Sequence, residues 1–249
     1  MKKNYLLVIS IFIVTNVSAQ SYKWSVYPSL GIDMGGAIPL PLSDIPKGAG
    51  GTPKLNPALG LGFEYRIKEK WLLGIEVNYH NLEFSAKADV RSQPFYFDNH
   101  ATILYFSGKT QTAIELRFVE FPFIASYRAG KNWSFLFGAY YSRILEGSFE
   151  TEGKDGVISP DKLITDNAVL PGVAITSYNF NDRIDTYDLG LFLGYRYQVG
   201  PKLAFFGRFH WGFKSIFKKE FDNIEYEMYQ LRLTAGISYS LFRSSPINQ

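Results

Sequence analysis

The chain of 249 residues contains no cysteine, and its other scarcities are equally informative. Without thiols, a disulfide scaffold and a thiolate metal site are both excluded. Disordered chains combine high net charge with few aromatic residues, whereas this chain has a formal net charge of +3 and 17% Phe, Tyr and Trp. Beyond the N-terminus no apolar run approaches the roughly 18 residues of a spanning helix, which excludes a helical membrane bundle. A mean hydropathy of −0.07 must therefore be reconciled with a large aromatic content.

The first residues have the three-part layout of a secretory signal peptide. Lys2 and Lys3 form a basic start, Tyr5–Val14 is apolar, and Val17–Ala19 places small residues where a signal peptidase cleaves. A membrane anchor would need about 20 apolar residues, and this run is too short. We expect residues 1–19 to be a signal peptide cleaved after Ala19, and the exported chain to meet no nucleic acid.

From residue 21 onward the dominant hydrophobic period is two, which is the period of a strand with one apolar face. Near the C-terminus, for example, Leu231 and Leu233 alternate with Arg232 and Thr234. Eight segments share this pattern: Trp24–Met34, Ala58–Ile67, Trp71–Phe84, Ile114–Arg128, Trp133–Phe149, Thr186–Val199, Lys202–Phe217 and Met228–Phe242.

In two of these segments the apolar face changes parity. The changes lie at His80/Asn81 and at Phe118/Val119. A β-bulge would produce such a change, and so would a strand that leaves the membrane.

The connections between the segments alternate in length. Tight turns at 68–70, 129–132 and 200–201 are rich in Gly, Pro and Lys. Long polar connections span 35–57, 85–113 and 150–185, with a shorter one at 218–227. Outer-membrane barrels follow this plan, with short turns in the periplasm and long loops outside.

A soluble barrel or sandwich is the competing interpretation, and residue size argues against it. The apolar face carries Trp, Phe, Tyr and Leu at nearly every step, while the opposite face is Gly, Ser and charged residues. Large side chains fit outside an eight-stranded barrel and small ones inside. We therefore predict an all-β protein, an eight-stranded antiparallel up-and-down transmembrane β-barrel over residues 20–242. Residues 243–249 are expected to form a short periplasmic tail.

Short motifs in three of the predicted strands resemble one protein family. Val119–Phe123 (VEFPF), Asp188–Tyr195 (DLGLFLGY) and Pro28–Gly35 (PSLGIDMG) are similar to strands of the PorT-like outer-membrane β-barrel proteins of the Bacteroidetes. The resemblance implies the barrel fold and an outer-membrane location for essentially the whole mature chain. A role in type IX secretion belongs to only some members of that family.

Strict alternation places a set of charged residues in the lumen. Unpaired charges in a narrow lumen are costly, so six acids and six bases suggest a paired network rather than a pore. The predicted lumen network is Asp33, Glu64, Arg66, Glu76, Glu120, Arg128, Glu146, Asp188, Arg196, Arg208, His210, Lys214 and Arg232.

The sequence contains no recognisable catalytic, cofactor or metal motif. The three histidines, His80, His100 and His210, lack metal-ligand spacing, and no G-x-S-x-G nucleophile motif occurs. Residues 155–166 contain acids but lack the pattern of a calcium loop. We therefore expect no cofactor, no metal and no enzymatic activity.

The function predicted from these observations is structural or interactive. We expect a contact surface in the outer loops, where binding residues concentrate. The apolar run 169–175 could extend the strands, fold over the mouth or contact a protein. The expected partners are outer-membrane lipid, the barrel insertion machinery and an extracellular or envelope protein, with the barrel itself a monomer. The alternatives are an accessory role in protein export, a lipid-modifying barrel enzyme and a narrow solute channel.

Overall fold

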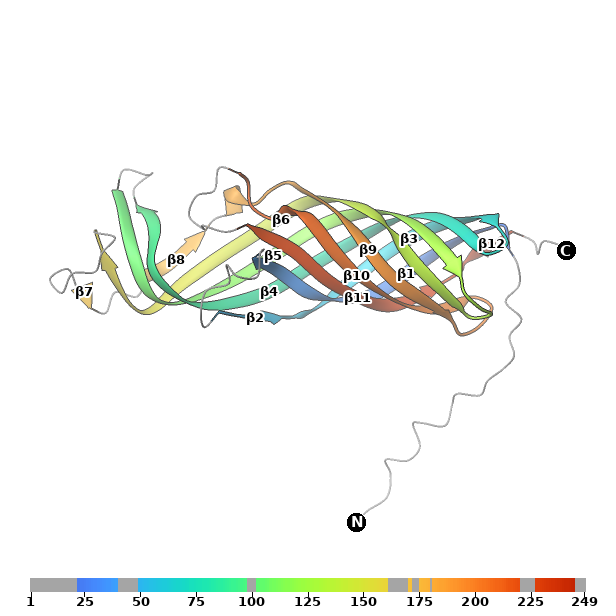
Figure 1. Cartoon of the computed structure of the whole chain (residues 1–249), viewed down its shortest axis with the longest axis horizontal. Helices are drawn as coiled ribbons and strands as arrows, with labels where there is room; N and C mark the ends of the chain where they lie inside the picture. The colour runs from blue at the N-terminus through green and yellow to red at the C-terminus, as the bar shows by residue number, and fades with distance from the viewer. Residues whose placement is uncertain are drawn as a thin grey trace, which may run out of the picture.

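The computed structural model describes residues 22–39, 49–97, 102–160, 170–171, 175–179, 181–219 and 227–244. Eight antiparallel strands form its closed wall: β1 (Trp24–Pro39), β3 (Leu55–Lys68), β4 (Trp71–Phe97), β5 (Thr102–Arg128), β6 (Trp133–Ser159), β9 (Tyr187–Gln198), β10 (Leu203–Ser215) and β11 (Met228–Tyr239). Each strand pairs with its neighbour in sequence, and β11 pairs with β1 to close the ring (Figure 1). The predicted up-and-down barrel is confirmed.

Short elements are attached to this ring. β2 (Gly50–Pro53) pairs with β4, while β7 (Leu170–Pro171) and β8 (Ile175–Asn179) pair with β6. β12 (Phe242–Arg243) pairs with β1, so strand pairing continues one residue beyond the predicted end at Phe242. A single turn of 3-10 helix, η2 (Asn181–Arg183), precedes β9. Among the described residues, no helix is long and apolar enough to cross a membrane.

The two ends of the barrel differ. The end with the tight turns is called here the turn end. It also carries the first and last described residues, Tyr22 and Ser244. The amides of Lys23 and Trp24 donate hydrogen bonds to Ser244 Oγ and so hold these two segments together. At the opposite, loop end, β4, β5 and β6 project well past the other strands (Figure 1). Each of these three strands has 27 residues, against the roughly 9–11 that span a bilayer.

The projecting hairpins correct the prediction that 85–113 is a loop. β4 and β5 remain paired from Trp71↔Tyr127 to Phe97↔Thr102, and β6 continues beside β5 to Ser159. Their backbone groups are thus satisfied by pairing, even where the sequence lacks an apolar face. Within the predicted loop 150–185, Leu170–Pro171 and Ile175 also pair with β6. These described residues of the run 169–175 therefore extend the strand pairing.

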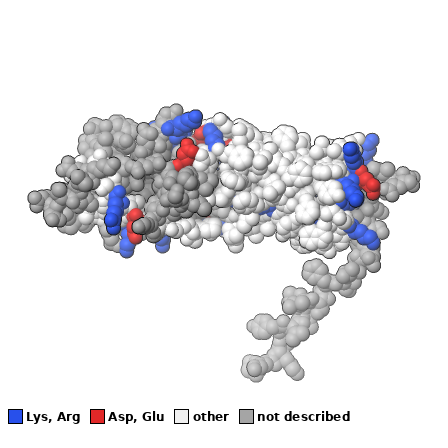
Figure 2. Space-filling model, in the orientation of Figure 1, with Lys and Arg blue, Asp and Glu red and all other residues white. Residues whose placement is uncertain are grey.

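The outer wall between the two ends is apolar. On the face shown in Figure 2, Lys, Arg, Asp and Glu gather toward the two ends, and the wall between them is almost uncharged. Leu30, Leu61, Ile75, Leu191 and Phe209 are among its outward-facing residues, all at least two-fifths exposed. Such a belt of exposed large apolar side chains is the arrangement of a barrel wall in lipid.

Small inward-facing residues make room for large ones in the lumen. A Cβ on Gly62 would lie 2.4 Å from the Tyr27 ring, and one on Gly190 would lie 2.5 Å from the Tyr140 ring. Glycine at these positions therefore allows a bulky side chain from a neighbouring strand to cross the lumen. The polar, Gly-rich alternate positions of the sequence form this inner face.

The two predicted parity changes share one structural origin, and it is not a β-bulge. Leu82 on β4 and Leu116 on β5 keep the inward parity of His80 and Glu120, so these strands are not bulged there. They leave the lipid belt, and the apolar residues move from the outer to the inner face. The irregularity lies on β6, where Leu145 is the extra residue between Ile144↔Phe118 and Glu146↔Arg117.

Candidate functional site

The lumen is crossed by three ion pairs that join strands on opposite sides of the ring. Arg196 of β9 pairs with Glu64 of β3, with 2.6 Å between Nη1 and Oε2. Arg208 of β10 pairs with Glu76 of β4 through two hydrogen bonds of 2.6 Å. In the closed strand order, the two strands of each pair lie four strands apart by either route.

The third pair joins Arg232 of β11 to Glu120 of β5, again four strands apart. From the turn end toward the loop end, each of the three pairs lies one strand further round the ring and higher in the lumen than the pair before it. On β10, Arg208 lies two residues beyond the partner of Arg196, and on β11, Arg232 lies two residues beyond the partner of Arg208. On the acidic side, Glu76 lies two residues beyond Gly74, the partner of Glu64. These two-residue offsets follow from the stagger of neighbouring strands in a tilted barrel.

Polar and aromatic side chains support the middle pair. Tyr27 Oη donates to Glu76 Oε1 at 2.8 Å, and Asn78 Nδ2 donates to Glu76 Oε2 at 3.1 Å. The Arg208 guanidinium lies 4.8 Å from the centroid of the Phe206 ring. Glu76 therefore accepts bonds from several donors, as a buried carboxylate requires.

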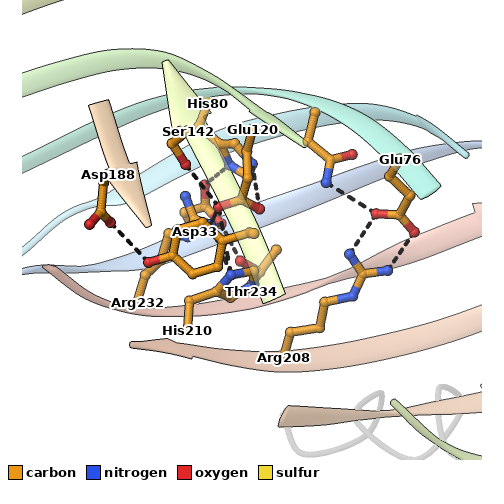
Figure 3. A network of polar contacts seen from close by, with 12 residues as sticks. Asp33, Glu76, His80, Glu120, Ser142, Asp188, Arg208, His210, Arg232 and Thr234 are labelled. Atoms are coloured by element: carbon orange, nitrogen blue, oxygen red, sulfur yellow. Dashed lines mark hydrogen bonds and ion pairs between the residues drawn. The ribbon is translucent and has the colours of Figure 1, made fainter. Parts of the chain in front are cut away.

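The upper pair belongs to a larger cluster that includes both described histidines (Figure 3). Arg232 Nη2 lies 3.1 Å from His210 Nδ1, and its Nε is 3.8 Å from Asp33 Oδ1. The two ring nitrogens of His80 face Asp33 Oδ2 at 2.5 Å and Glu120 Oε1 at 3.7 Å. All five side chains are almost completely buried.

Hydroxyl groups complete the cluster. Thr234 Oγ1 donates to Asp33 Oδ1 at 2.6 Å, and Tyr140 Oη donates to Asp188 Oδ2 at 2.9 Å. In the described part of the chain, neither His80 nor His210 is hydrogen-bonded to a serine or threonine hydroxyl. A cavity of about 10 Å³ beside these histidines has room for one water molecule.

An apolar layer lies above the charged cluster, inside the loop end of the barrel. Its buried residues come from the wall strands and from the segments that precede β9 and follow β10. They are Ala37, Leu82, Phe84, Ile114, Leu116, Phe118, Phe149, Ile184, Ile216, Phe217 and Met228. Phe118 joins the two layers, since its ring stacks on His80 at 4.9 Å and lies 5.0 Å from the Arg232 guanidinium. The lumen is thus filled by charged pairs below and by apolar side chains above.

Nine of the predicted network residues are buried in the lumen. They are Asp33, Glu64, Glu76, Glu120, Asp188, Arg196, Arg208, His210 and Arg232. Five carboxylates therefore face three arginines, so the predicted balance of six acids and six bases is wrong. The five carboxylates exceed the three arginines by two. His80 and Tyr140 each form a hydrogen bond with one of the carboxylates.

Glu146 is the clearest departure, because it lies outside the barrel. The extra residue at Leu145 reverses the parity of β6, and Glu146 pairs across the outer surface with Arg117 at 2.5 Å. A hydrogen bond to Glu115, with the charges of Glu115 and Glu146, raises the pKa of Arg117. These outward-facing charges also mark where the apolar belt ends on β5 and β6.

The remaining three predicted residues lie at the two rims. Arg66 donates through Nε to the Tyr22 carbonyl at 2.8 Å, and Arg128 is half-buried, both at the turn end. Lys214 forms an ion pair with Asp185 near the loop end. Each follows the inward alternation but lies where its strand leaves the filled part of the lumen. His100 and most of residues 169–175 lie outside the described residues.

The predicted network includes His210 but leaves out His80, and sequence reasoning missed the apolar layer. His80 stands at the even positions of β4 with Glu76 and Asn78, so alternation could have included it. The parity changes at His80/Asn81 and Phe118/Val119 were the available signal for the apolar layer.

Among the described residues, no group of three or more His, Asp or Glu side chains is arranged to hold a metal ion.

Comparison with known proteins identifies the family. Residues 18–218 match the family model described as outer membrane protein beta-barrel domain. No curated protein matches the chain. Similar solved structures include Neisserial surface protein A (13% identity, 88% of this chain and 97% of that chain covered, TM-score 0.43).

Two further structures are similar at lower identity. Ail, the attachment invasion locus protein of Yersinia pestis, is 9% identical over 88% of this chain and 98% of its own, with a TM-score of 0.38. OprG from Pseudomonas aeruginosa is 11% identical over 90% and 98%, with a TM-score of 0.34. The family match covers most of the chain, and the protein belongs to the outer-membrane β-barrel domain family.

Proposed function

We propose that this outer-membrane protein is a non-conducting barrel without catalytic activity that binds a partner through its projecting strands. In this proposal, a signal peptide cleaved after Ala19 directs export, and the insertion machinery places the barrel as a monomer in outer-membrane lipid. The turn end then faces the periplasm and the loop end faces outward. The partner is an extracellular or envelope protein.

The contrast between the sealed lumen and the long strands carries the proposal. Three cross-lumen ion pairs and the apolar layer fill the interior, and charges that are paired in this way are not available to select a permeating ion. By contrast, β4, β5 and β6 each extend far beyond the lipid belt. A membrane anchor alone would not need this extension, whereas a partner-binding surface would.

The surroundings of the two described histidines support a role without catalysis. A hydrolase needs a nucleophilic hydroxyl near a base, oriented by an acid and open to substrate. His80 instead contacts Asp33, and His210 contacts Arg232, deep in the lumen. The adjoining cavity of about 10 Å³ is far smaller than a substrate pocket.

The β5 motif supports placement among PorT-like proteins. Glu120 points inward to Arg232, while Phe121 and Phe123 face outward. Pro122 has no N–H, and the β4–β5 pairing is interrupted between Ile75↔Phe123 and Asn78↔Glu120. The alternating motif thus combines a lumen charge, two lipid contacts and a tolerated break in the ladder.

Planar-bilayer recording tests the sealed lumen. The purified barrel should produce no stepwise conductance, while a known porin reconstituted under the same conditions verifies that channels would be detected. Reproducible single-channel steps from the wild-type barrel would contradict the proposal.

A shortened β4–β5 hairpin tests the binding surface. Asp89 and Lys109 are paired, so residues 90–108 can be replaced by Asn-Gly, which favours a two-residue hairpin turn. The shortened barrel should fold, as shown by heat-modifiable gel mobility, but lose the protein crosslinks that the full chain forms on intact cells. Identical crosslinks from both chains would argue against this surface as the binding site.

A further inference from the structure

A cavity of about 30 Å³ lies inside the turn end, below the lowest ion pair. It is lined by side chains from several strands and turns, among them Ser126, Arg128, Lys131, Arg196 and Arg243. A cavity needs about 10–15 Å³ of volume for each water molecule, so this cavity has room for two or three waters. The same space accommodates the few oxygen atoms of a small oxyanion.

The cavity lining is cationic. Four basic side chains, Arg128, Lys131, Arg196 and Arg243, take part in it, and no Asp or Glu does so. The nearby Glu64 is already engaged by Arg196 and by the Tyr22 hydroxyl. Within the described ranges, the side chains of Arg128 and Lys131 form no ion pair. Like charges brought together around a hollow repel one another unless an anion neutralises them.

Buried donors without protein partners provide a second, independent observation. Arg196 is only 9% exposed and its Nε has no hydrogen-bond partner among the described residues. The same holds for Nε of Arg243, whose other nitrogens are bonded to Pro201 O and Ser240 Oγ. A buried donor that remains unpaired is costly, so two of them beside one cavity point to a ligand that accepts hydrogen bonds.

The cations are also held in place. The Arg243 guanidinium lies 4.4 Å from the centroid of the Tyr22 ring, and that of Arg66 lies 5.4 Å from the same ring. Tyr22 thereby orders two guanidinium groups beneath the lumen. The hydroxyls of Ser126 and Ser134 add neutral donors to the cavity wall. Fixed guanidinium, ammonium and hydroxyl donors together match the acceptor oxygens of a phosphate group.

We propose that this turn-end cavity is a binding site for a phosphate group, supplied by a soluble phosphate or by a lipid headgroup of the adjacent leaflet. Arg196 and Arg243 contribute guanidinium donors, and Lys131 contributes a point charge. Bound phosphate would neutralise the cationic cluster and join the segment before β1, the 129–132 turn and β12 at this end of the barrel.

The test uses the purified full-length barrel in a zwitterionic detergent, with inorganic phosphate as the probe. Calorimetric titration should show saturable binding, and phosphate should raise the unfolding temperature above that in sodium chloride of matched ionic strength. In the double variant Arg128→Gln, Lys131→Gln, phosphate affinity should fall about tenfold or more. Lys70→Gln is the matched control, because Lys70 is exposed in a turn at the same end and does not line the cavity.

A second arm distinguishes the source of the phosphate. The barrel is reconstituted in bilayer discs of phosphatidylcholine alone or with phosphatidylglycerol, and the unfolding temperatures of wild type and double variant are compared. Stabilisation by inorganic phosphate supports a soluble ligand, and stabilisation by the anionic lipid alone supports a headgroup, provided that the double variant abolishes it. Absence of stabilisation in both arms, or equal stabilisation of the correctly folded double variant, would overturn the proposal.

Discussion

Arg232 on β11 is paired with Glu120 on β5, although these strands lie on opposite sides of the barrel. Both side chains are almost fully buried, and Asp33 approaches the same guanidinium. Because Arg196–Glu64 and Arg208–Glu76 have the same relation, each of these three buried arginines joins two opposite strands of the ring. The ion pairs therefore contribute to closure as well as to filling the lumen.

Removing the upper cation should strongly destabilise the barrel. Arg232→Met leaves two buried carboxylates, Glu120 and Asp33, without their arginine. The free energy of unfolding should fall by about 3–5 kcal/mol, the usual cost of stranding a buried charge. Urea titration of the detergent-solubilised barrel, followed by tryptophan fluorescence, measures the change. Lys218→Met, at a more exposed site, is the control, and an equal effect in both variants would refute the role given to Arg232.

The middle ion pair should show strong coupling in a double-mutant cycle. Arg208→Met alone strands Glu76, whereas Glu76→Gln together with Arg208→Met removes both charges and keeps an acceptor for Tyr27. The double variant should therefore recover most of the stability lost in Arg208→Met, since replacing a whole buried pair is often nearly neutral. Additive losses, measured by the same urea titrations, would mean that the two residues do not act as a pair.

Glu146 offers a direct test of the β6 bulge. On the outer surface its ion pair with Arg117 is solvent-accessible, so Glu146→Gln should cost less than about 1 kcal/mol of unfolding free energy. Glu76→Gln, the comparison variant, strands Arg208 in the lumen and should cost several times more. If strict alternation held and Glu146 faced inward, the two substitutions would have comparable effects.

These residues show how far alternation predicts the site. A period of two assigns each residue of an unbulged strand to the lumen or the lipid, and it placed Glu64, Glu76 and Glu120 on the inner face. It fails at Glu146, because one added residue reverses every later side chain and Leu145 has no distinctive sequence signal. The partners of the glutamates could not be predicted either, since they depend on ring closure and stagger rather than on sequence separation.

The hydrophobic pattern of the sequence does not show the length of the projecting strands, for a related reason. Residues 85–113 lie in the β4–β5 hairpin beyond the lipid belt, where neither face has to be uniformly apolar. A method that reads strands from one apolar face therefore stops at Phe84 and resumes at Ile114. Both residues belong instead to the apolar layer inside the mouth, where the hydrophobic face has moved inward.

The boundary of the lipid belt can be tested with one substitution at two depths. Leu191 faces outward near the middle of β9, flanked by the exposed Leu189 and Leu193, while Gln111 faces outward on the projecting part of β5. Leu191→Arg should reduce the unfolding free energy in lipid vesicles by about 2–4 kcal/mol, because it places a charge near the bilayer midplane. Gln111→Arg should change it by no more than about 0.5 kcal/mol, as expected for an exposed site in water. Equal penalties at the two positions would mean that lipid also covers the projecting hairpin, and the proposed partner surface would then have to lie elsewhere.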